Sequence, residues 1–103
     1  MADYLFAPEV VEDLKGIFDY TIARWGIEQA YRYKGKLTFH FRQIAQGKAQ
    51  TRAFLKKSPE LHVSRCEHHY IFHLIRKNQP PLIIAVLHES MDIISRIRGR
   101  LDR

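Results

Sequence analysis

The chain has 103 residues, of which 46% are hydrophobic and 12% aromatic, and its formal net charge at pH 7 is +6. These values exclude a disordered chain and predict one domain over residues 1–103. The longest apolar run, Leu82 to Leu87, is far shorter than the roughly 20 residues that span a membrane. The acidic start lacks the positive charge of a signal peptide. A cytoplasmic protein is therefore expected, and a single cysteine excludes an internal disulfide.

The charge is unevenly distributed. Residues 1–28 contain six acidic and two basic side chains, a net charge of −4, whereas the remaining 75 residues contain five acidic and 15 basic side chains, a net charge of +10. An excess of positive charge attracts a polyanion, which here means nucleic acid or an acidic protein segment. The alternative is a solvated basic surface without a partner.

The first half of the chain predicts a short strand and two helices. Residues 3–7 read as the strand, and Pro8 then suits the first turn of a helix, where its missing N–H is not needed. Apolar residues recur every three or four positions, which is typical of one helix face. In the first helix this face comprises Val11, Leu14, Phe18, Ile22 and Trp25, and in the second Ala30, Tyr33, Leu37, Phe41 and Ile44. Gly26 and Gly47 end the two helices, and the short connection predicts an antiparallel hairpin.

The second half predicts three strands and a last helix. The pattern breaks over residues 48–60, with Ser58-Pro59 as a turn, and strands are expected over 61–67, 68–76 and 81–89. The third strand is apolar on both alternating sets, as in a strand covered on both faces in the middle of a sheet. Ser90 is the expected cap of a short C-terminal helix. The order β-α-α-β-β-β plus this helix predicts an α+β fold, a helical hairpin on a small, mainly antiparallel sheet.

The stretch CEHHYIFHLI, residues 66–75, raises the question of a metal or acid–base site. In a strand, His69 and His73 lie about 13 Å apart at roughly 3.3 Å per residue. This is too far to share a zinc ion whose ligands lie at roughly 2.1 Å, so we expect no metal and no cofactor. We interpret the histidines as half-exposed strand positions beside core residues, which are Tyr70, Phe72 and Leu74.

Fragments over nearly the whole chain resemble the ParE branch of the RelE/ParE superfamily of bacterial type II toxins. APEVVEDLKGIFDYTIARWGIEQA resembles the family's first helix, its Trp-Gly break and the start of its second helix. HHYIFHLI resembles a family strand, and VLHESMD resembles the ending that follows it. The chain departs from the family at Ala7, where a serine is often found, and at His73, where a tyrosine is common.

The resemblance implies a toxin that inhibits DNA gyrase without catalysing a reaction and that is neutralised by direct binding of a ParD-like antitoxin. It implies no membrane partner and no sequence-specific DNA binding by the toxin alone. RelE-like relatives instead cut mRNA on the ribosome, typically with a tyrosine near the C-terminus, and this chain has no tyrosine after His88. A ribonuclease using Arg65, His69 and Arg76 is therefore the alternative. A third hypothesis is a basic nucleic-acid-binding module without toxicity.

Two sets of site residues are expected. The antitoxin-binding candidates are Tyr20, Arg24, Trp25 and Arg65. For Trp25, core packing is the favoured interpretation. The target-inhibition candidates are His88, Met91, Asp92, Arg96 and Arg98. The alternative for this second set is that Met91 and Ile94 seat the last helix on the core while the arginines are only solvated.

Overall fold

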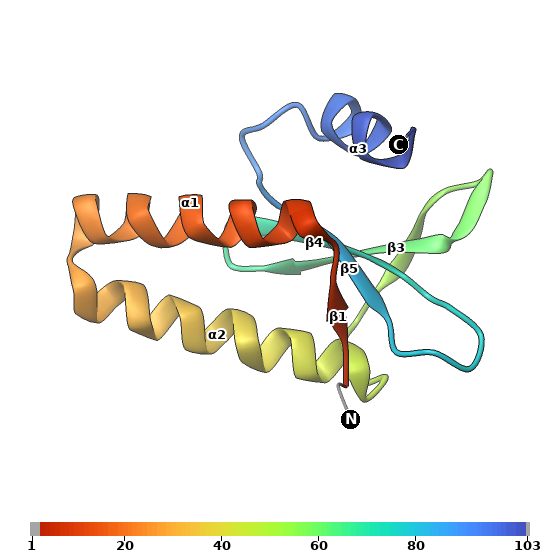
Figure 1. Ribbon diagram of the computed structural model, residues 1–103, viewed down its shortest axis with the longest axis horizontal. Helices are drawn as coiled ribbons and strands as arrows, with labels where there is room; N and C mark the ends of the chain where they lie inside the picture. The colour runs from red at the N-terminus through yellow and green to blue at the C-terminus, as the bar shows by residue number, and fades with distance from the viewer. Residues whose placement is uncertain (1–2, 103) are drawn as a thin grey trace.

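A computed structural model describes residues 3–102 as a helical hairpin, a five-stranded sheet and a C-terminal helix (Figure 1). The elements are β1 (Leu5–Phe6), α1 (Pro8–Trp25), α2 (Ile27–Ala45), β2 (Arg52–Leu55), β3 (Ser58–Cys66), β4 (His69–Leu74), β5 (Leu82–His88) and α3 (Ile93–Leu101). The strand order is β1-β5-β4-β3-β2, with β1 parallel to β5 and every other pair antiparallel. The predicted α+β fold is confirmed. Among the described helices, none is long and apolar enough to cross a membrane.

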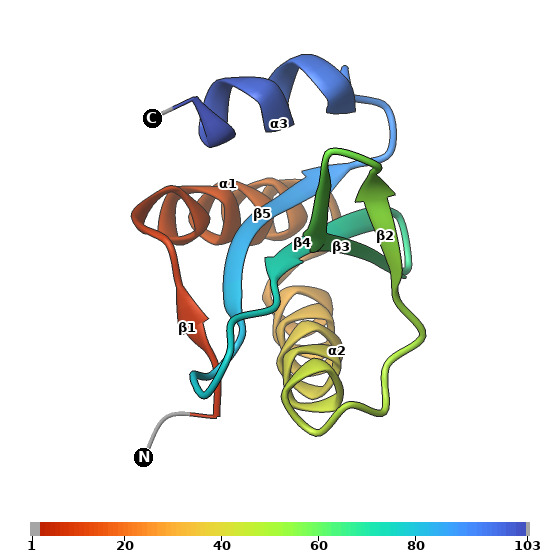
Figure 2. The same cartoon turned by 90° about the vertical axis from the view of Figure 1, so that its right-hand side faces the viewer.

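The sheet separates two apolar clusters. The helical hairpin covers the first cluster, which comprises Val10, Leu37, Phe41, Ile44, Ile71, Ile83 and Val86. The second cluster lies under α3, which crosses the top of the molecule in Figure 2, and comprises Leu61, Val63, Phe72, Ile84, Ala85, Leu87 and Ile97. β5 contributes to both clusters and its five central residues are buried, so the prediction of a strand covered on both faces is confirmed.

The edge strand β2 was not expected from the sequence. It pairs with β3, and a β-bulge separates Ala53 from Leu55, which interrupts the alternation that marks a strand. The ring of Phe54 meets the ring of Phe72 edge-on at 4.9 Å between centroids. Ser58 pairs with Leu55, so the predicted turn at Ser58-Pro59 is wrong and the chain reverses two residues earlier.

The face of α1 that packs on the sheet differs from the predicted face. Val10 is fully buried and Thr21 nearly so, whereas Val11 is 57% exposed and Trp25 65% exposed. Leu14, Phe18 and Ile22 of the predicted face are half-buried. The buried stripe is therefore shifted toward Val10 and Thr21 by less than the roughly 100° that separates successive residues. The core-packing interpretation of Trp25 is wrong. In α2 the predicted face is confirmed, with Tyr33 half-buried and the other members buried.

The C-terminal helix is capped and seated differently from the prediction. Asp92, not Ser90, is the N-cap: its carboxylate accepts hydrogen bonds from the N–H of Ser95 at 3.4 Å and from the Ser95 hydroxyl at 2.9 Å. Ile97 is 1% exposed and anchors α3 on the sheet. Ile94 and Met91 are 53% and 41% exposed, so the idea that these two seat the helix is wrong.

Two side chains bind the part of the β5 edge that β1 leaves uncovered. β1 pairs only with Leu82 and Ile83. Farther along, the N–H of Val86 donates to the Asp13 carboxylate at 3.0 Å, and Arg100 donates to the carbonyl of Ile84 at 2.9 Å. The guanidinium and the carboxylate also bind each other through two contacts of 2.6 Å. This ion pair joins α1, β5 and α3.

Ile97→Ala is expected to lower the free energy of unfolding by about 2–4 kcal/mol, because it removes the most deeply buried side chain of α3 and leaves a cavity. Ile94→Ala removes the same atoms from an exposed position three residues away, and its expected effect is within about 0.5 kcal/mol. Urea denaturation followed by circular dichroism measures both. Equal effects of the two substitutions would contradict this packing of α3.

Candidate functional site

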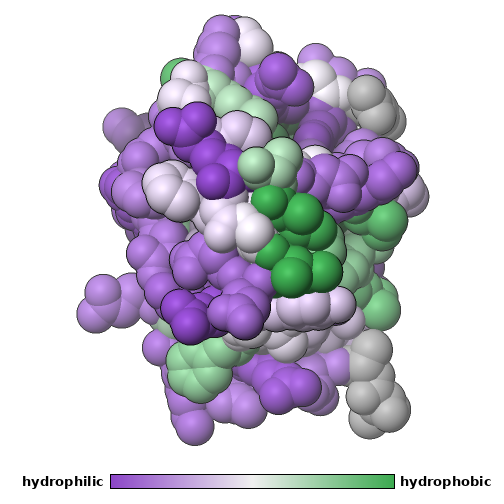
Figure 3. Space-filling model, turned by 90° about the vertical axis from the view of Figure 1, so that its left-hand side faces the viewer, coloured by the Kyte–Doolittle hydropathy of each residue, from purple (hydrophilic) through white to green (hydrophobic). Residues whose placement is uncertain are grey.

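The end of the helical hairpin exposes several large apolar side chains. The chain reverses at Gly26, whose φ of +93° is a backbone conformation that glycine adopts readily. Tyr20, Trp25 and Tyr31 are 62%, 65% and 58% exposed, and the Arg24 guanidinium lies 5.5 Å from the centroid of the Trp25 ring. Figure 3 looks onto this end and shows a compact hydrophobic patch, coloured green, within a mostly hydrophilic face. Tyrosine and tryptophan are not coloured as hydrophobic on the scale of that figure, so this patch adds aliphatic surface to the exposed rings. Contiguous exposed apolar surface is typical of a binding site.

A groove of about 340 Å³ runs between α1 and α2. Its apolar lining comes from both helices and from the start of the chain and comprises Tyr4, Phe6, Leu14, Ile17, Phe18, Ala30, Tyr33, Leu37 and Phe41. Lys15, on α1, and Lys34, on α2, also line the groove. Apolar walls with positive charge on both helices suit an amphipathic segment that carries acidic residues.

Arg65 is held by a different part of the molecule from the other three antitoxin-binding candidates. Its guanidinium lies 5.5 Å from the centroid of the Tyr70 ring, donates to the carbonyl of Glu67 at 2.9 Å and forms an ion pair with Glu89. Its side chain is nevertheless 52% exposed. The structure therefore divides the four candidates into a hairpin group of three and a single residue on the sheet.

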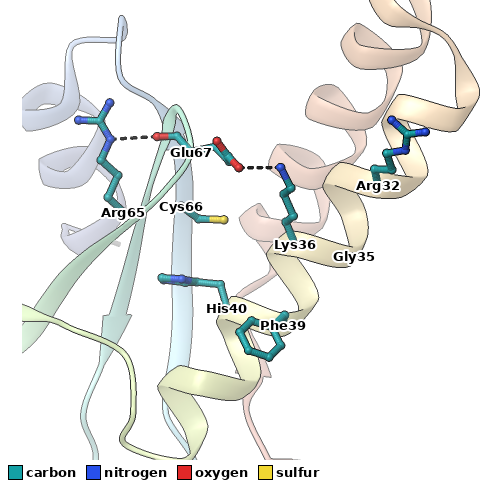
Figure 4. A pocket seen from close by; sticks show the side chains of 8 residues that line it. All are labelled: Arg32, Gly35, Lys36, Phe39, His40, Arg65, Cys66 and Glu67. Atoms are coloured by element: carbon teal, nitrogen blue, oxygen red, sulfur yellow. Dashed lines mark hydrogen bonds and ion pairs between the residues drawn. The ribbon is translucent and has the colours of Figure 1, made fainter.

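A second, open groove of about 520 Å³ lies between α2 and the β3–β4 turn (Figure 4). Lys36 crosses it to form an ion pair with Glu67 at 2.8 Å, which holds the pKa of that carboxyl below its usual range. Cys66 also lines the groove. Burial, reinforced by the charge of Glu67, raises the pKa of its thiol. Because the thiolate is the reactive form, this cysteine is a poor nucleophile.

The first group of histidines lies on the hairpin face of the sheet. His73 is only 3% exposed, so its interpretation as a half-exposed position is wrong. The His62 and His73 ring centroids are 5.7 Å apart, and His40 on α2 shares a 2.7 Å hydrogen bond with the Ser64 hydroxyl. Burial, followed by the proximity of His62 and His40, lowers the pKa of His73 to about 4. Within the described residues, Nδ1 of His73 has no hydrogen-bond partner.

The second group of histidines lies at the ends of β4 and β5. His69 is 2.5 Å from the Tyr33 hydroxyl through Nδ1, and its ring meets that of His88 edge-on at 5.2 Å. Burial, together with the neighbouring His88 and His68, lowers the pKa of His69 to about 4. His69 is therefore neutral near pH 7 and tied to α2. A general acid–base group works best with a pKa close to the working pH.

The structure does not bring the three alternative ribonuclease residues together. Arg65 pairs with Tyr70 in the register of β3 and β4, and His69 follows the opposite alternation, so the two side chains lie on opposite faces of the sheet. Arg76 lies beyond the other end of β4, where it donates twice to the carbonyl of Pro80. Within residues 3–102, no group of three His, Cys, Asp or Glu side chains is arranged to hold a metal ion.

The target-inhibition candidates lie along one continuous segment that begins at His88, the last residue of β5. The N–H of Ser90 donates to Nδ1 of His88 at 3.1 Å, which leaves the other ring nitrogen for a partner. Arg96 and Arg98 are exposed on α3, as is Asp92 at its start. Arg100 differs from these arginines because its side chain is only 14% exposed. The spacing of Ile93, Ile97 and Arg100 on one helix face was the sequence signal for this difference.

Comparisons with known proteins cover almost the whole chain. The family described as "ParE toxin of type II toxin-antitoxin system, parDE" matches residues 4–93. Toxin ParE of Escherichia coli is 40% identical over 101 residues, which are 98% of each chain. Toxin ParE1 of Mycobacterium tuberculosis is 28% identical over 90 residues, 87% of this chain and 92% of that one. A solved structure titled "Chromosomal ParDE TA system from P. aeruginosa" shares the fold, with a TM-score of 0.70 at 13% identity over 82% of this chain and 92% of that chain.

Acidification from pH 7 to pH 5 is expected to destabilise the fold through His73. Its pKa is about 4 in the folded chain, below the unfolded value of about 6.5, so the unfolded chain takes up the proton first. The stabilisation is complete above pH 6.5 and is lost as the pH falls toward 4, with about 2 kcal/mol lost at pH 5. Urea denaturation at both pH values measures this loss, which His73→Leu should reduce. His68→Leu is the control because that side chain is 71% exposed, and an unchanged pH dependence in His73→Leu would contradict the assignment.

Proposed function

We propose that this chain, which belongs to the ParE toxin family of type II toxin–antitoxin systems, inhibits DNA gyrase, blocks replication and is neutralised by direct binding of a ParD-like antitoxin. The family match across residues 4–93 carries this proposal. The protein acts in the cytoplasm as a binding protein and not as an enzyme.

The arrangement of the titratable residues supports a non-catalytic mode of action. His69 and His73 both have a pKa of about 4 and pack between the sheet and α2. Arg65, His69 and Arg76 have separate contacts on different parts of the sheet. Cleavage of RNA without a metal needs an acid, a base and cations around one phosphate. Binding to a target needs only an exposed surface, and α3 provides one.

The hairpin surface is the proposed antitoxin site. An antitoxin segment that folds on binding would place apolar side chains in the groove between α1 and α2 and acidic side chains near Lys15 and Lys34. Tyr20, Arg24 and Trp25 lie at the hairpin end, where aromatic and arginine side chains often dominate binding energy. The negative charge of the antitoxin would speed the encounter with the basic toxin.

The target-inhibition surface is proposed to be the end of β5 together with the outer side of α3. Asp92, Arg96 and Arg98 are presented there, and Met91 adds an apolar side chain that is 41% exposed. His88, the remaining candidate, lies at the end of β5 with its ring against His69, on the opposite face of the sheet. This surface is formed by different elements from the hairpin groove. An antitoxin bound only to the hairpin would therefore leave the target-inhibition surface uncovered. To block the target by direct occlusion, it would have to extend toward Arg65 and α3.

Purified protein added to gyrase, ATP and relaxed DNA is expected to abolish supercoiling and to accumulate linear, gyrase-linked DNA, because a bound toxin arrests the cleaved state. Gel electrophoresis measures both products. Prior addition of the antitoxin should restore supercoiling. Unimpaired supercoiling in the presence of folded protein would overturn the gyrase proposal and would favour ribosome-dependent mRNA cleavage.

Trp25→Ala is expected to weaken antitoxin binding by about tenfold or more, as the loss of a central aromatic contact does. Gyrase inhibition should stay unchanged, because Trp25 lies on the hairpin and not on α3. Isothermal titration calorimetry with the antitoxin measures the affinity. Ile75→Ala, just after β4, is the control because Ile75 is a large apolar side chain that is 51% exposed and lies on neither proposed surface. Equal losses for the two substitutions would contradict a specific site at the hairpin end.

The double substitution Arg96→Glu and Arg98→Glu is expected to raise the concentration needed for half-inhibition of gyrase by about tenfold or more, because two contacting charges are reversed. Lys56→Glu with Lys57→Glu makes the same change in net charge on the exposed β2–β3 turn and serves as the control. Unchanged inhibition by the α3 variant, or an equal loss in the control, would remove α3 from the target surface.

A further inference from the structure

The arginines of α3 occupy two different environments. Arg96 and Arg98 are exposed, whereas Arg100 turns inward with Ile93 and Ile97, at the spacing of one helix face. A positively charged surface on α3 requires only exposed arginines and gives no reason for one that faces the sheet. The burial of Arg100 therefore does not follow from the charge of the surface.

Apolar packing attaches α3 to the sheet mainly through one residue. The helix has nine residues, and among them Ile97 is buried and Ile93 is half-buried. An isolated helix of this length is unstable in water and depends on tertiary contacts. Ile97 lies in the middle of α3, so the last turn requires another attachment.

Arg100 provides that attachment in the last turn. Its guanidinium makes two contacts of 2.6 Å with the Asp13 carboxylate and a third, of 2.9 Å, with the carbonyl of Ile84. Asp13 in turn accepts the N–H of Val86 at 3.0 Å. The side chains of Asp13 and Arg100 are 12% and 14% exposed, so solvent screens the pair little. The hydrogen bond to Asp13 also raises the pKa of Arg100, which keeps the guanidinium charged.

The pair acts on α3 without contacting the proposed antitoxin site. Asp13 is on the side of α1 that faces β5 and does not line the proposed antitoxin groove, although the next residues, Leu14 and Lys15, do. Tyr20 and Trp25 are exposed more than one helical turn farther along α1. A change at Arg100 removes side-chain atoms that contact only α1 and β5 among the contacts described above. The two proposed surfaces are therefore separable by substitution at this pair.

We propose that Asp13 and Arg100 are positioning residues for target inhibition: their ion pair fixes the last turn of α3 on the sheet and thereby holds Asp92, Arg96 and Arg98 in the arrangement that the target binds. This rests on the proposed function of the α3 surface. It also means that a truncation before α3 cannot assign toxicity to α3, because the truncation also removes the partner of Asp13 and so changes α1 and β5.

The test compares Arg100→Met, which keeps the length of the side chain but removes its charge and donors, with the double variant Asp13→Asn, Arg100→Met. In the double variant the introduced amide oxygen can still accept the N–H of Val86, and no unpaired charge remains buried. Arg52→Met is the control, since Arg52 is exposed on β2 and belongs to neither proposed surface. Full-length protein is used throughout.

Hydrogen exchange, thermal unfolding, antitoxin affinity and gyrase inhibition are measured for each variant. In both Arg100 variants, the amides of α3 should exchange about tenfold or more faster than in the unmodified chain, while those of β3, β4 and β5 keep their protection. The half-inhibitory concentration should rise about tenfold and the antitoxin affinity should change less than about threefold. The double variant should regain most of the thermal stability but not the gyrase inhibition. If the ion pair contributed only to stability, inhibition would return together with stability.

Unchanged protection of α3 in the variants would overturn the attachment, and fast exchange with unchanged inhibition would overturn the positioning role. If Arg100→Met does not fold, hydrogen exchange and gyrase inhibition of the double variant test the attachment of α3 and its positioning role. Wild-type inhibition by the double variant would also overturn the proposal. If the unmodified chain itself does not inhibit gyrase, the proposed function fails, and the exchange measurement still decides whether the ion pair holds α3.

Discussion

The ion pair between Asp13 and Arg100 binds backbone groups of β5 that the short first strand leaves without a partner. β1 supplies only two residues, so the β5 edge beyond Ile83 has no strand to bond with, although Ile84 and Val86 are buried. A buried backbone group without a partner costs about 1–3 kcal/mol. The carboxylate and the guanidinium satisfy one donor and one acceptor of this edge and neutralise each other. Because one comes from α1 and the other from α3, the same contacts set where both helices lie on the sheet.

The positions of these helices create two exposed surfaces of different chemistry. The hairpin has an apolar groove with lysines on both helices and aromatic side chains at its end. The outer side of α3 carries arginines and has no comparable groove among the described residues. A toxin that must bind both an inhibitor and a target benefits from such a division, since each surface can have its own partner. The proposed antitoxin and target sites follow this division.

Much of the fold follows from local patterns that the sequence displays directly. The apolar face of α2, the hairpin at Gly26 and the double-sided burial of β5 were predicted correctly, because each is strongly periodic or strongly apolar. The buried face of α1 was predicted only in part, because apolar residues on that helix occupy two adjacent faces and Val10 and Val11 are equally good candidates for the core. β2 was missed because its bulge and exposed residues disrupt the alternation of a strand.

The candidate site was less accessible to sequence reasoning than the fold was. The family resemblance placed the candidate residues on segments whose exposure depends on what packs over each position. Trp25 is exposed because α1 turns a different face to β5, and His73 is buried because the hairpin face of the sheet is covered at that point. Two residues of the same β4 alternation, His69 and His73, thus acquired different partners.

The sequence by itself determined the order of the helices and strands, the charge asymmetry and the membership of a toxin family, since these depend on residue type and spacing along the chain. Only the tertiary structure decided that Arg65 and His69 lie on opposite faces and that Asp13 meets Arg100. Asp13 and Arg100 are 87 residues apart in the chain. No local pattern specifies such a pair, because it exists only where two helices converge on an uncovered strand edge.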